Sequence, residues 1–539
     1  MRRPNGPSAA AAAGDAAPVP ARANPILRPN PQSPDVAKYF LTTAIDYSNG
    51  DPHLGHALEK IGADAIARYR RLQGDDVHFL MGMDENSQSV IEMSTKHAIT
   101  PEAWVDQMAE RFTRYWHRLE CSNDDWIRTT EPRHTQAVLA LLSRILTKSP
   151  DDVFLADYEG LYCTGCEDFK TESQIVDGKC AEHPTLALVP TKETNHFFRL
   201  SAYRDRILAL ITSGELAVEP EIRRNEILRL LEGGLQDISI SRSRLPWGIP
   251  FPGSEGHTVY VWFDAVINYL AATGFPEPGY QRLWPADLHI IGKGITRFHC
   301  VLWPAMCLAA GIAPPKMVWA HGYVQWLGAK MSKTAGTAVN LDEAINRYGA
   351  DPLRYFLMRE VGFEADGDFT WERYDARYTS DLADGLGNLV ARSLAMIEKY
   401  RGGVVPTGET TSLDREVIDH HVPAYRAAME RLDLKGGLDA IWAIIAAADL
   451  YITQTAPWGL AKAGNQSALD DALASLARTL VRITVLVGPF VPAKAAEIWQ
   501  SLGQTEPLTA IRWTTVQNPV IQGLTIARPA ILFPKPNPA

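Results

Sequence analysis

The chain has 539 residues, of which 46% are apolar and 22% charged, and its formal net charge is −10. This length predicts two to four domains, and the composition is ordinary for a globular protein. A net acidic chain is not coated in basic surface, so nucleic acid would have to be bound by local patches. We find no apolar run of about 18 residues, which argues against a membrane-spanning helix.

Residues 1–37 are rich in Ala and Pro and show no amphipathic period, so we expect a disordered tail. No apolar segment follows Arg2 and Arg3, which argues against a secretory signal and leaves an organellar transit peptide as a weaker alternative. In residues 38–149, apolar runs ("YFLTTAI", "DVHFLMGM") then alternate with segments whose apolar residues have helical spacing. This alternation predicts an α/β fold with a doubly wound, parallel, Rossmann-like sheet.

The alternation is interrupted and then resumes. Residues 150–255 hold a cysteine cluster and Pro/Gly-marked segments, which predicts a domain inserted into the sheet. Residues 256–325 read as the second half of the catalytic domain and 326–380 as a linker domain around a lysine loop. Long helical segments over 381–535 predict a C-terminal helical bundle, followed by a short tail at 536–539.

A cluster of soft ligands lies in the predicted insertion. The segments "CTGC" and "CAEH" place Cys163, Cys166, Cys180 and His183 as two knuckle pairs. Two such pairs suit tetrahedral Zn²⁺, and four protein ligands close the site, so we predict one structural zinc rather than a catalytic one. Unrelated buried thiols are the alternative.

A second motif, "NGDPHLGHA", follows the first apolar run and carries His53 and His56. Two histidines at this spacing can bind a metal, pack in a core or hold a phosphate. The predicted position is the carboxyl end of a strand and the start of a helix near Leu54, where the backbone favours anions and Gly55 permits close approach. Further along, "GAKMSKTAG" holds Lys330 and Lys333 in a glycine-bounded loop that could bring two positive charges onto a triphosphate.

These two motifs resemble the signatures of class I aminoacyl-tRNA synthetases. Further segments narrow the resemblance to methionyl-tRNA synthetases, in the order of that family and over about residues 38 to 535: "DWIRTTEPRH", "EGLYCTGC", "SISRSRLPWGIP", "YVWFDAVINYL", "RYGADPLRYFLMRE", "DLADGLGNLVARS" and "APWGLAK". The resemblance implies a methionine–tRNA ligase, which forms methionyl-adenylate from methionine and ATP and then charges tRNA(Met).

The resemblance also implies roles for individual residues. Catalysis is expected of His53, His56, Lys330 and Lys333, which would contact the phosphates while Mg²⁺ accompanies ATP. ATP binding is expected of His53, Gly55, His56, Glu59, Gly292, Lys330, Ser332 and Lys333. A mostly apolar methionine pocket, suited to a thioether, is expected of Ile45, Tyr47, Trp262, Ala265, Tyr269, Ile295, His299 and Trp303, with Asp84 receiving the substrate ammonium. Anticodon binding is expected of Asn388, Arg392 and Trp458.

Three segments depart from the family pattern. "ENS" follows Asp84 where Glu-His-Gly is common, and Thr334 replaces a serine with its hydroxyl kept. The larger departure is "GKG", because Gly294 stands where the family usually has an aspartate that touches the ribose. Glu59 matches another ribose-contacting acid.

Two alternatives remain beside the ligase. One is a class I synthetase for another amino acid, although about 100 residues between the sheet halves is too short for a large editing insertion. The other is a tRNA-binding paralogue that no longer activates methionine, for which Gly294 is the best support. The expected partners are tRNA(Met), methionine and ATP, with no membrane. We expect a cytoplasmic monomer, since no dimerisation domain follows the helical region.

Overall fold

The computed structural model describes residues 36–165, 168–170, 172–181, 186–243, 245–330 and 339–535. Within these residues a seven-stranded sheet has the order β10-β15-β14-β1-β3-β2, with β4 paired to β3, and its pairings are parallel. Its strands are β1 (Lys38–Thr43), β2 (Asp46–Tyr47), β3 (Asp76–Asp84), β4 (Asp125–Arg128), β10 (Ala217–Glu219), β14 (Leu288–Gly292) and β15 (Met317–His321). The predicted parallel α/β sheet is confirmed.

Helices cover both faces of this sheet. Successive strand residues point to opposite faces, so Leu41 of β1 packs in one core with α1 (Leu54–Gln73) and α3 (Pro101–Arg118). Its neighbour Phe40 packs in a second core with α4 (Pro132–Lys148) and α9 (Trp303–Ala309). The shorter helices α2 (Gln88–Lys96), α7 (Val261–Ala265) and α8 (Asn268–Ala271) complete this part of the chain. The sheet is therefore buried on both sides, as parallel sheets are.

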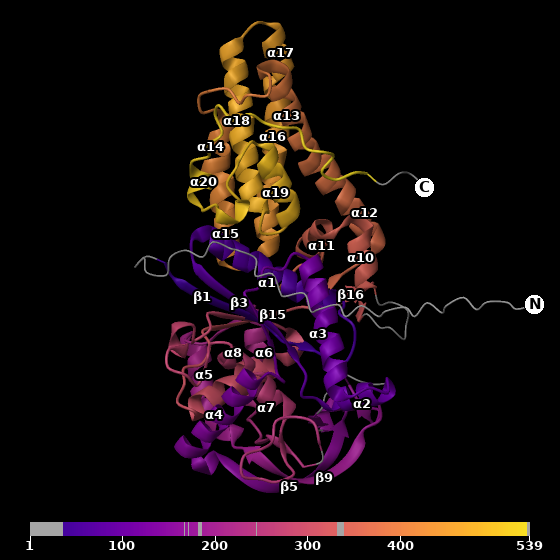
Figure 1. Ribbon diagram of the computed structural model, residues 1–539. Coiled ribbons are helices and arrows are strands. Elements are labelled where there is room, and N and C mark those ends of the chain that lie inside the picture. Colours follow the sequence, from indigo (N-terminus) through magenta and orange to yellow (C-terminus); the bar gives the residue numbers. More distant parts are fainter. Residues whose placement is uncertain are drawn as a thin grey trace, which may run out of the picture.

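A second, antiparallel sheet has the order β11-β9-β5-β6. It consists of β5 (Val153–Cys163), β6 (Asp168–Lys170), β9 (Val189–Phe198) and β11 (Ile238–Ser239), and Figure 1 places β5 and β9 at the end of the molecule away from the C-terminal helices. Between α5 (Arg204–Ser213) and α6 (Glu221–Glu232), however, β10 pairs with β15 of the central sheet. The expected insertion over 150–255 therefore includes one strand of the main sheet, because a three-residue strand carries too little periodicity to be recognised.

A small sheet links the catalytic domain to the helical bundle. It has the order β17-β16-β18 and consists of β16 (Val324–Trp326), β17 (Ala329–Lys330) and β18 (Gly367–Asp368). The helices of this region are α10 (Leu341–Tyr348), α11 (Ala350–Phe356) and α12 (Trp371–Arg377).

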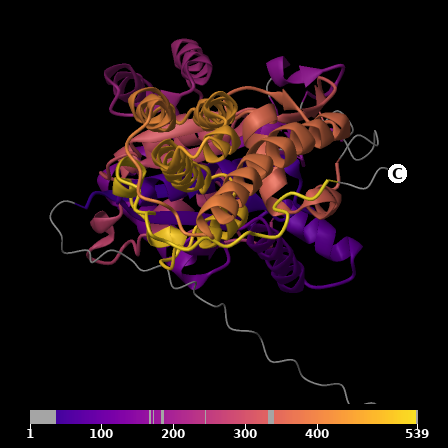
Figure 2. The same ribbon diagram turned by 90° about the horizontal axis from the view of Figure 1, so that it is seen from above.

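The C-terminal helices stand on the catalytic domain, and the view from above shows several of them nearly end-on over the indigo strands (Figures 1 and 2). The predicted helical domain is confirmed. Beyond its first turn, α18 is almost entirely buried and forms the centre of the bundle. The helices are α13 (Asn388–Arg401), α14 (Ser412–Glu416), α15 (Val422–Glu430), α16 (Leu434–Thr455), α17 (Pro457–Lys462), α18 (Gln466–Val487), α19 (Pro492–Ser501) and α20 (Thr514–Gln517).

One helical stretch of the described residues, Leu434–Lys462, is long and apolar enough to cross a membrane by length and composition alone. This stretch differs from the expectation that the chain has no apolar run of about 18 residues. Half of its most apolar window is buried, and α16 packs against α13, α15 and α18. This burial is what a core helix of a bundle requires.

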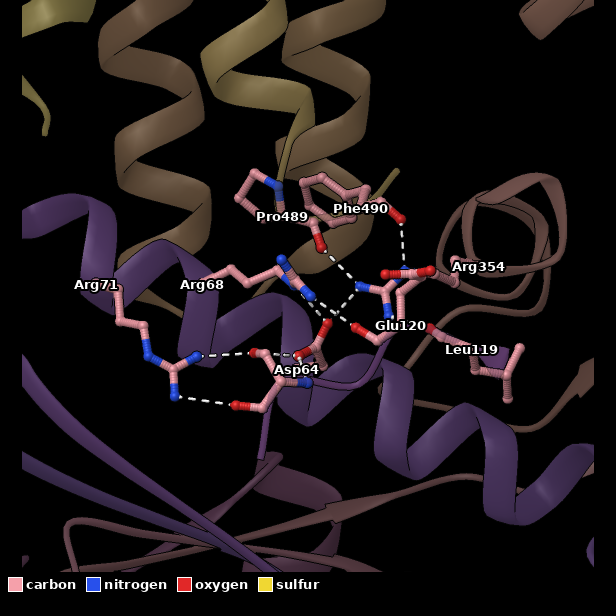
Figure 3. Close-up of polar contacts among 9 residues, drawn as sticks. Asp64, Arg68, Arg71, Leu119, Glu120, Arg354, Pro489 and Phe490 are labelled. Carbon is pink, nitrogen blue, oxygen red and sulfur yellow. Dashed lines mark hydrogen bonds and ion pairs between the residues drawn. The ribbon is translucent and has the colours of Figure 1, made fainter. Parts of the chain in front are cut away.

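The helical bundle and the catalytic domain are joined by a buried polar junction (Figure 3). The guanidinium of Arg354 in α11 donates to the Asp64 carboxylate in α1 at 2.7 Å. The same group donates to the carbonyl oxygens of Leu119, Pro489 and Phe490 at 2.9 Å each. One arginine thus donates hydrogen bonds both to the sheet domain, at α1 and after α3, and to the turn between α18 and α19 in the bundle.

Candidate active site

Two histidines begin the helix that follows the central strand β1. His53 is the N-cap of α1, and its Nδ1 accepts from the backbone N–H of Gly55 at 3.1 Å and of His56 at 3.4 Å. The His56 Nδ1 accepts in return from the His53 N–H at 3.3 Å, and the rings stack with centroids 3.8 Å apart. Because each Nδ1 accepts, the proton of each neutral ring is on Nε2. Both rings can therefore donate to an anion at this helix N-terminus.

One helical turn later, Glu59 is buried beside a third histidine, His321. Its Oε2 lies 3.0 Å from the Nε2 of His321 at the end of β15, and its Oε1 lies 2.7 Å from the ammonium of Lys60. Burial by itself raises the pKa of Glu59, but Lys60 and His321 outweigh burial and lower the pKa below its ordinary value. Lys60 also pairs with Asp46 at 2.9 Å. The Glu59 carboxylate is therefore held in place by a buried network of ion pairs.

A cavity of about 1030 Å³ opens at the carboxyl ends of the central strands. It brings together most of the residues selected from the sequence. The predicted ATP-binding residues that line it are His53, Gly55, His56, Glu59 and Gly292, and the predicted methionine-binding residues that line it are Ile45, Tyr47, Asp84, Trp262, Ala265, Tyr269, Ile295 and His299. Strands β1 and β14 are neighbours whose connections run to opposite sides of the sheet, which is where ligands bind in such folds.

Aromatic side chains form one part of this cavity. The rings of Tyr47 and Trp262 stack with centroids 6.2 Å apart, and Phe298 stacks on Trp262 at 4.3 Å. His299 lies in a π-helical turn, Phe298–Leu302, of the kind that often marks functional sites. Its Nδ1 lies 3.0 Å from the carbonyl of Ile295 and its Nε2 lies 2.7 Å from the Tyr269 hydroxyl.

These contacts define the protonation of His299. With a proton on Nδ1 donated to the Ile295 carbonyl, Nε2 accepts from the Tyr269 hydroxyl, as a neutral imidazole does. Burial lowers the pKa of His299 to about 4. This part of the cavity is therefore aromatic, polarisable and uncharged at neutral pH.

Asp84 and Trp303 occupy different positions relative to the cavity. Asp84 ends β3, lines the cavity and is buried, and its backbone carbonyl accepts from Ser48. Trp303 is fully buried and is not among the lining residues. Its ring lies behind Tyr269, with centroids 6.4 Å apart, and its N–H points to His289. The structure therefore places Trp303 as packing support for Tyr269 rather than at the cavity wall.

Three residues at the end of β15 also line the cavity and were not selected from the sequence: His321, Gly322 and Tyr323. The signal that could have found them is "HGY" at the end of an apolar run, because strand ends at this edge carry ligand contacts. The predicted lysine loop is the remaining group of expected phosphate-binding residues. Ser332, Lys333 and the Lys330 side chain lie outside the described residues.

The predicted zinc ligands are described only in part. Cys163 ends β5 and Cys180 lies in β8 (Lys179–Cys180), and both are buried. Cys166 and His183 lie outside the described residues. Within the described part of the chain, no group of three or more His, Cys, Asp or Glu residues could hold a metal ion. Two buried thiols are compatible with the donor chemistry of a zinc site.

The predicted anticodon residues lie on the helical bundle. Asn388 begins α13 and is exposed. Arg392, one turn later, is paired with Asp449 of α16 at 3.0 Å and remains 39% exposed. Trp458 of α17 has 51% of its surface exposed, which is unusual for a side chain of this size. An exposed indole can stack an unpaired base.

A doubly wound sheet with paired histidines at the N-terminus of its first crossover helix, joined to a helical bundle, defines a class I aminoacyl-tRNA synthetase. Comparisons with known proteins specify the family. The model described as "tRNA synthetases class I (M)" matches residues 39–185 and 185–394, and the model described as "Anticodon binding domain of methionyl tRNA ligase" matches residues 402–537.

Individual relatives agree. The methionine–tRNA ligase of Mesorhizobium japonicum is 40% identical over 92% of this chain and 98% of its own length, and that of Streptomyces coelicolor is 36% identical over 92% and 96%. A solved structure of Mycobacterium tuberculosis methionyl-tRNA synthetase in complex with methionyl-adenylate superposes with a TM-score of 0.88 and 37% identity, covering 93% of this chain and all of that one. The chain therefore belongs to the methionine–tRNA ligase family, and the resemblance inferred from its motifs is confirmed.

Proposed function

We propose that the chain activates methionine with ATP to methionyl-adenylate and pyrophosphate, and then transfers the methionyl group to the 3′ end of tRNA(Met). This is the activity of its family. One observation supports it most directly: a single cavity joins the two phosphate-facing histidines of α1 to a neutral aromatic pocket. The first part suits the triphosphate and the second suits a flexible thioether.

Activation is a displacement at the α-phosphorus. A methionine carboxylate oxygen forms the new bond to phosphorus, and the bond to the bridging oxygen of pyrophosphate breaks. No protein nucleophile is needed, so the protein contributes position and charge stabilisation. The Nε2–H groups of His53 and His56 donate to phosphate oxygens, and Lys333, supported by Lys330 and Ser332, neutralises the leaving pyrophosphate. Mg²⁺ bound to ATP supplies further charge neutralisation.

The part of the methionine pocket that receives the thioether side chain works by excluding charge and water. Asp84 receives the substrate ammonium at the end of β3. Tyr269 and His299 are bonded to each other and so present no unsatisfied polar group to the thioether. A leucine or valine side chain would lack the polarisable sulfur that favours contact with Tyr47, Trp262 and Tyr269.

Beyond the cavity we propose one structural zinc on Cys163, Cys166, Cys180 and His183, where it would tie the turns of the inserted sheet together. We propose that Asn388, Arg392 and Trp458 bind unstacked anticodon bases. The chain is expected to act as a cytoplasmic monomer, which light scattering coupled to size-exclusion chromatography would test.

Amino-acid-dependent ATP–pyrophosphate exchange tests the proposal. Exchange is expected with methionine, with leucine and cysteine as matched controls that give none. Exchange driven by leucine or cysteine instead would assign another class I substrate. Absence of exchange with every amino acid, together with normal tRNA binding, would identify a tRNA-binding paralogue.

A further inference from the structure

A buried polar network that the proposed chemistry does not use lies directly behind the wall of the cavity. Asp264 of α7 has no exposed surface, and its two carboxylate oxygens have different partners. The side-chain amide of Asn86 donates to Oδ2 at 2.8 Å. The Nε2–H of His134, a fully buried residue of α4, donates to Oδ1, since a carboxylate only accepts. None of these three described residues is among those that line the cavity.

Asp264 belongs to the short helix that carries part of the aromatic wall. Trp262 and Ala265 line the cavity, and residues three apart share one face of a helix. Asp264 points away from that face, toward His134 in α4. The Trp262 ring stacks with Phe298 and with Tyr47. Whatever holds Asp264 therefore also holds the Trp262 ring in its place at the cavity wall.

Asn86 belongs to the segment that carries the expected ammonium site. It follows Asp84, the last residue of β3, by two positions and is itself buried. Its amide donates to the carbonyl of Thr129, just after β4, at 3.1 Å and to Asp264 at 2.8 Å, so both amide hydrogens are used. One side chain therefore ties the end of the central sheet, next to Asp84, to the helix behind Trp262.

The carboxylate of Asp264 makes the bond from Asn86 a strong one. Hydrogen bonds to an ionised acceptor are shorter and about twice as strong as neutral ones. A buried carboxylate that loses a donor also bears the desolvation penalty. In the proposed function the ammonium of methionine lies at Asp84 and its thioether at the aromatic wall. The distance from Asp84 to Trp262 therefore limits the length of the side chain that fits between them.

We propose that Asn86 is a positioning residue for methionine: its bond to Asp264 fixes the distance between Asp84 and Trp262 and so sets the side-chain length that the pocket accepts. The proposal rests on the proposed function, since it requires methionine in this cavity. It also gives a role to the segment "ENS", in which Asn86 stands where the family commonly has histidine. An amide and an imidazole can both donate to a buried carboxylate.

The Asn86→Ala variant tests this role in ATP–pyrophosphate exchange, with rates normalised to active sites by the burst of adenylate. Because Asp264 loses a donor, KM for methionine should rise about 3- to 10-fold while KM for ATP stays unchanged. Discrimination against ethionine, which is one methylene longer than methionine, should fall. A purely structural role would reduce the number of active sites and leave both KM values and the discrimination as they are. Asn195→Ala, which removes a buried amide bonded to Glu193 in β9, is the matched control and should behave as wild type.

A pair of variants tests the bond itself and carries the test if Asn86→Ala does not fold. Asn86→Asp turns a second carboxylate toward Asp264 and should raise KM for methionine more than Asn86→Ala does. Adding Asp264→Asn exchanges donor and acceptor between the two positions and should recover part of the loss.

Two results would overturn the proposal. One is an Asn86→Ala enzyme with unchanged KM for methionine and unchanged discrimination against ethionine. The other is an equal KM for methionine in Asn86→Asp and in the exchanged pair, because the bond to Asp264 would then not position the wall. Absence of methionine-dependent exchange in the wild type would instead count against the proposed function.

Discussion

Arg354 and Asp64 form an ion pair of 2.7 Å in which neither side chain has exposed surface. Burial by itself raises the pKa of Asp64, but Arg68, Arg354 and the Ser122 hydroxyl outweigh burial and lower the pKa to about 2. The carboxylate is therefore charged at any physiological pH. Because Arg354 also donates to Pro489 and Phe490, this pair connects α1 of the catalytic domain with the helical bundle.

Replacing Arg354 should weaken the junction between the domains. Arg354→Met leaves Asp64 and three carbonyl oxygens short of a donor, so we expect a loss of about 3–5 kcal/mol and a lower thermal midpoint in calorimetry. Arg354→Lys should lose nearly as much, because an ammonium cannot reach all four acceptors in the geometry of a guanidinium. Arg431→Met, which removes a 67% exposed side chain paired with Asp433, is the control and should cost less than about 1 kcal/mol. A lysine variant as stable as wild type would contradict this role.

His299 should make stability depend on pH in a defined window. Its folded pKa of about 4 lies below the ordinary value of 6.5, so the unfolded chain binds the proton more tightly. The stability linked to neutral His299 is complete above pH 6.5 and is lost as pH falls toward 4. The free energy of unfolding that is lost amounts to about 3 kcal/mol. His299→Gln cannot take up this proton. We therefore expect the thermal midpoint of wild type to fall more steeply than that of His299→Gln between pH 6.5 and 4.5; parallel curves would refute it.

His53 combines a structural and a chemical role that two variants can separate. His53→Ala removes the N-cap acceptor and the phosphate donor, while His53→Asn keeps a good N-cap but is too short to donate as the imidazole does. Both should lower kcat for adenylate formation by about 10²- to 10³-fold, and only His53→Ala should also lose about 1 kcal/mol of stability. Single-turnover kinetics and thermal melts measure the two effects. A fully active His53→Asn enzyme would show that His53 acts only as the N-cap of α1 and not as a phosphate donor.

Cys163→Ser tests the proposed zinc. We expect zinc content, measured by mass spectrometry of the purified chain, to fall from one equivalent to none, and the inserted sheet to become sensitive to protease. Cys121→Ser, outside the cluster, should retain the metal. Unchanged zinc in Cys163→Ser would show that the ligand set is wrong.

The features that were predictable from the sequence are local ones. The strand, turn and helix around His53 and His56 are contiguous, so their place at a helix N-terminus followed from the pattern. Contacts between distant segments did not follow. The pairing of β10 with β15 rests on three residues, and Trp303 lies behind Tyr269 because of how helices pack. The phenol of Tyr323 fills the space of Gly294 because two neighbouring strands end together, which no single segment encodes.

Helix α1 also fixes a length. It carries His53 and His56 at one end, and at the other the Leu72 carbonyl accepts from the Trp513 N–H at 2.8 Å while the Tyr69 hydroxyl donates to Glu430 of α15 at 2.9 Å. Its 20 residues make a rod of about 30 Å. One continuous helix therefore sets the separation between His53 and the contacts that α1 makes with the helical bundle.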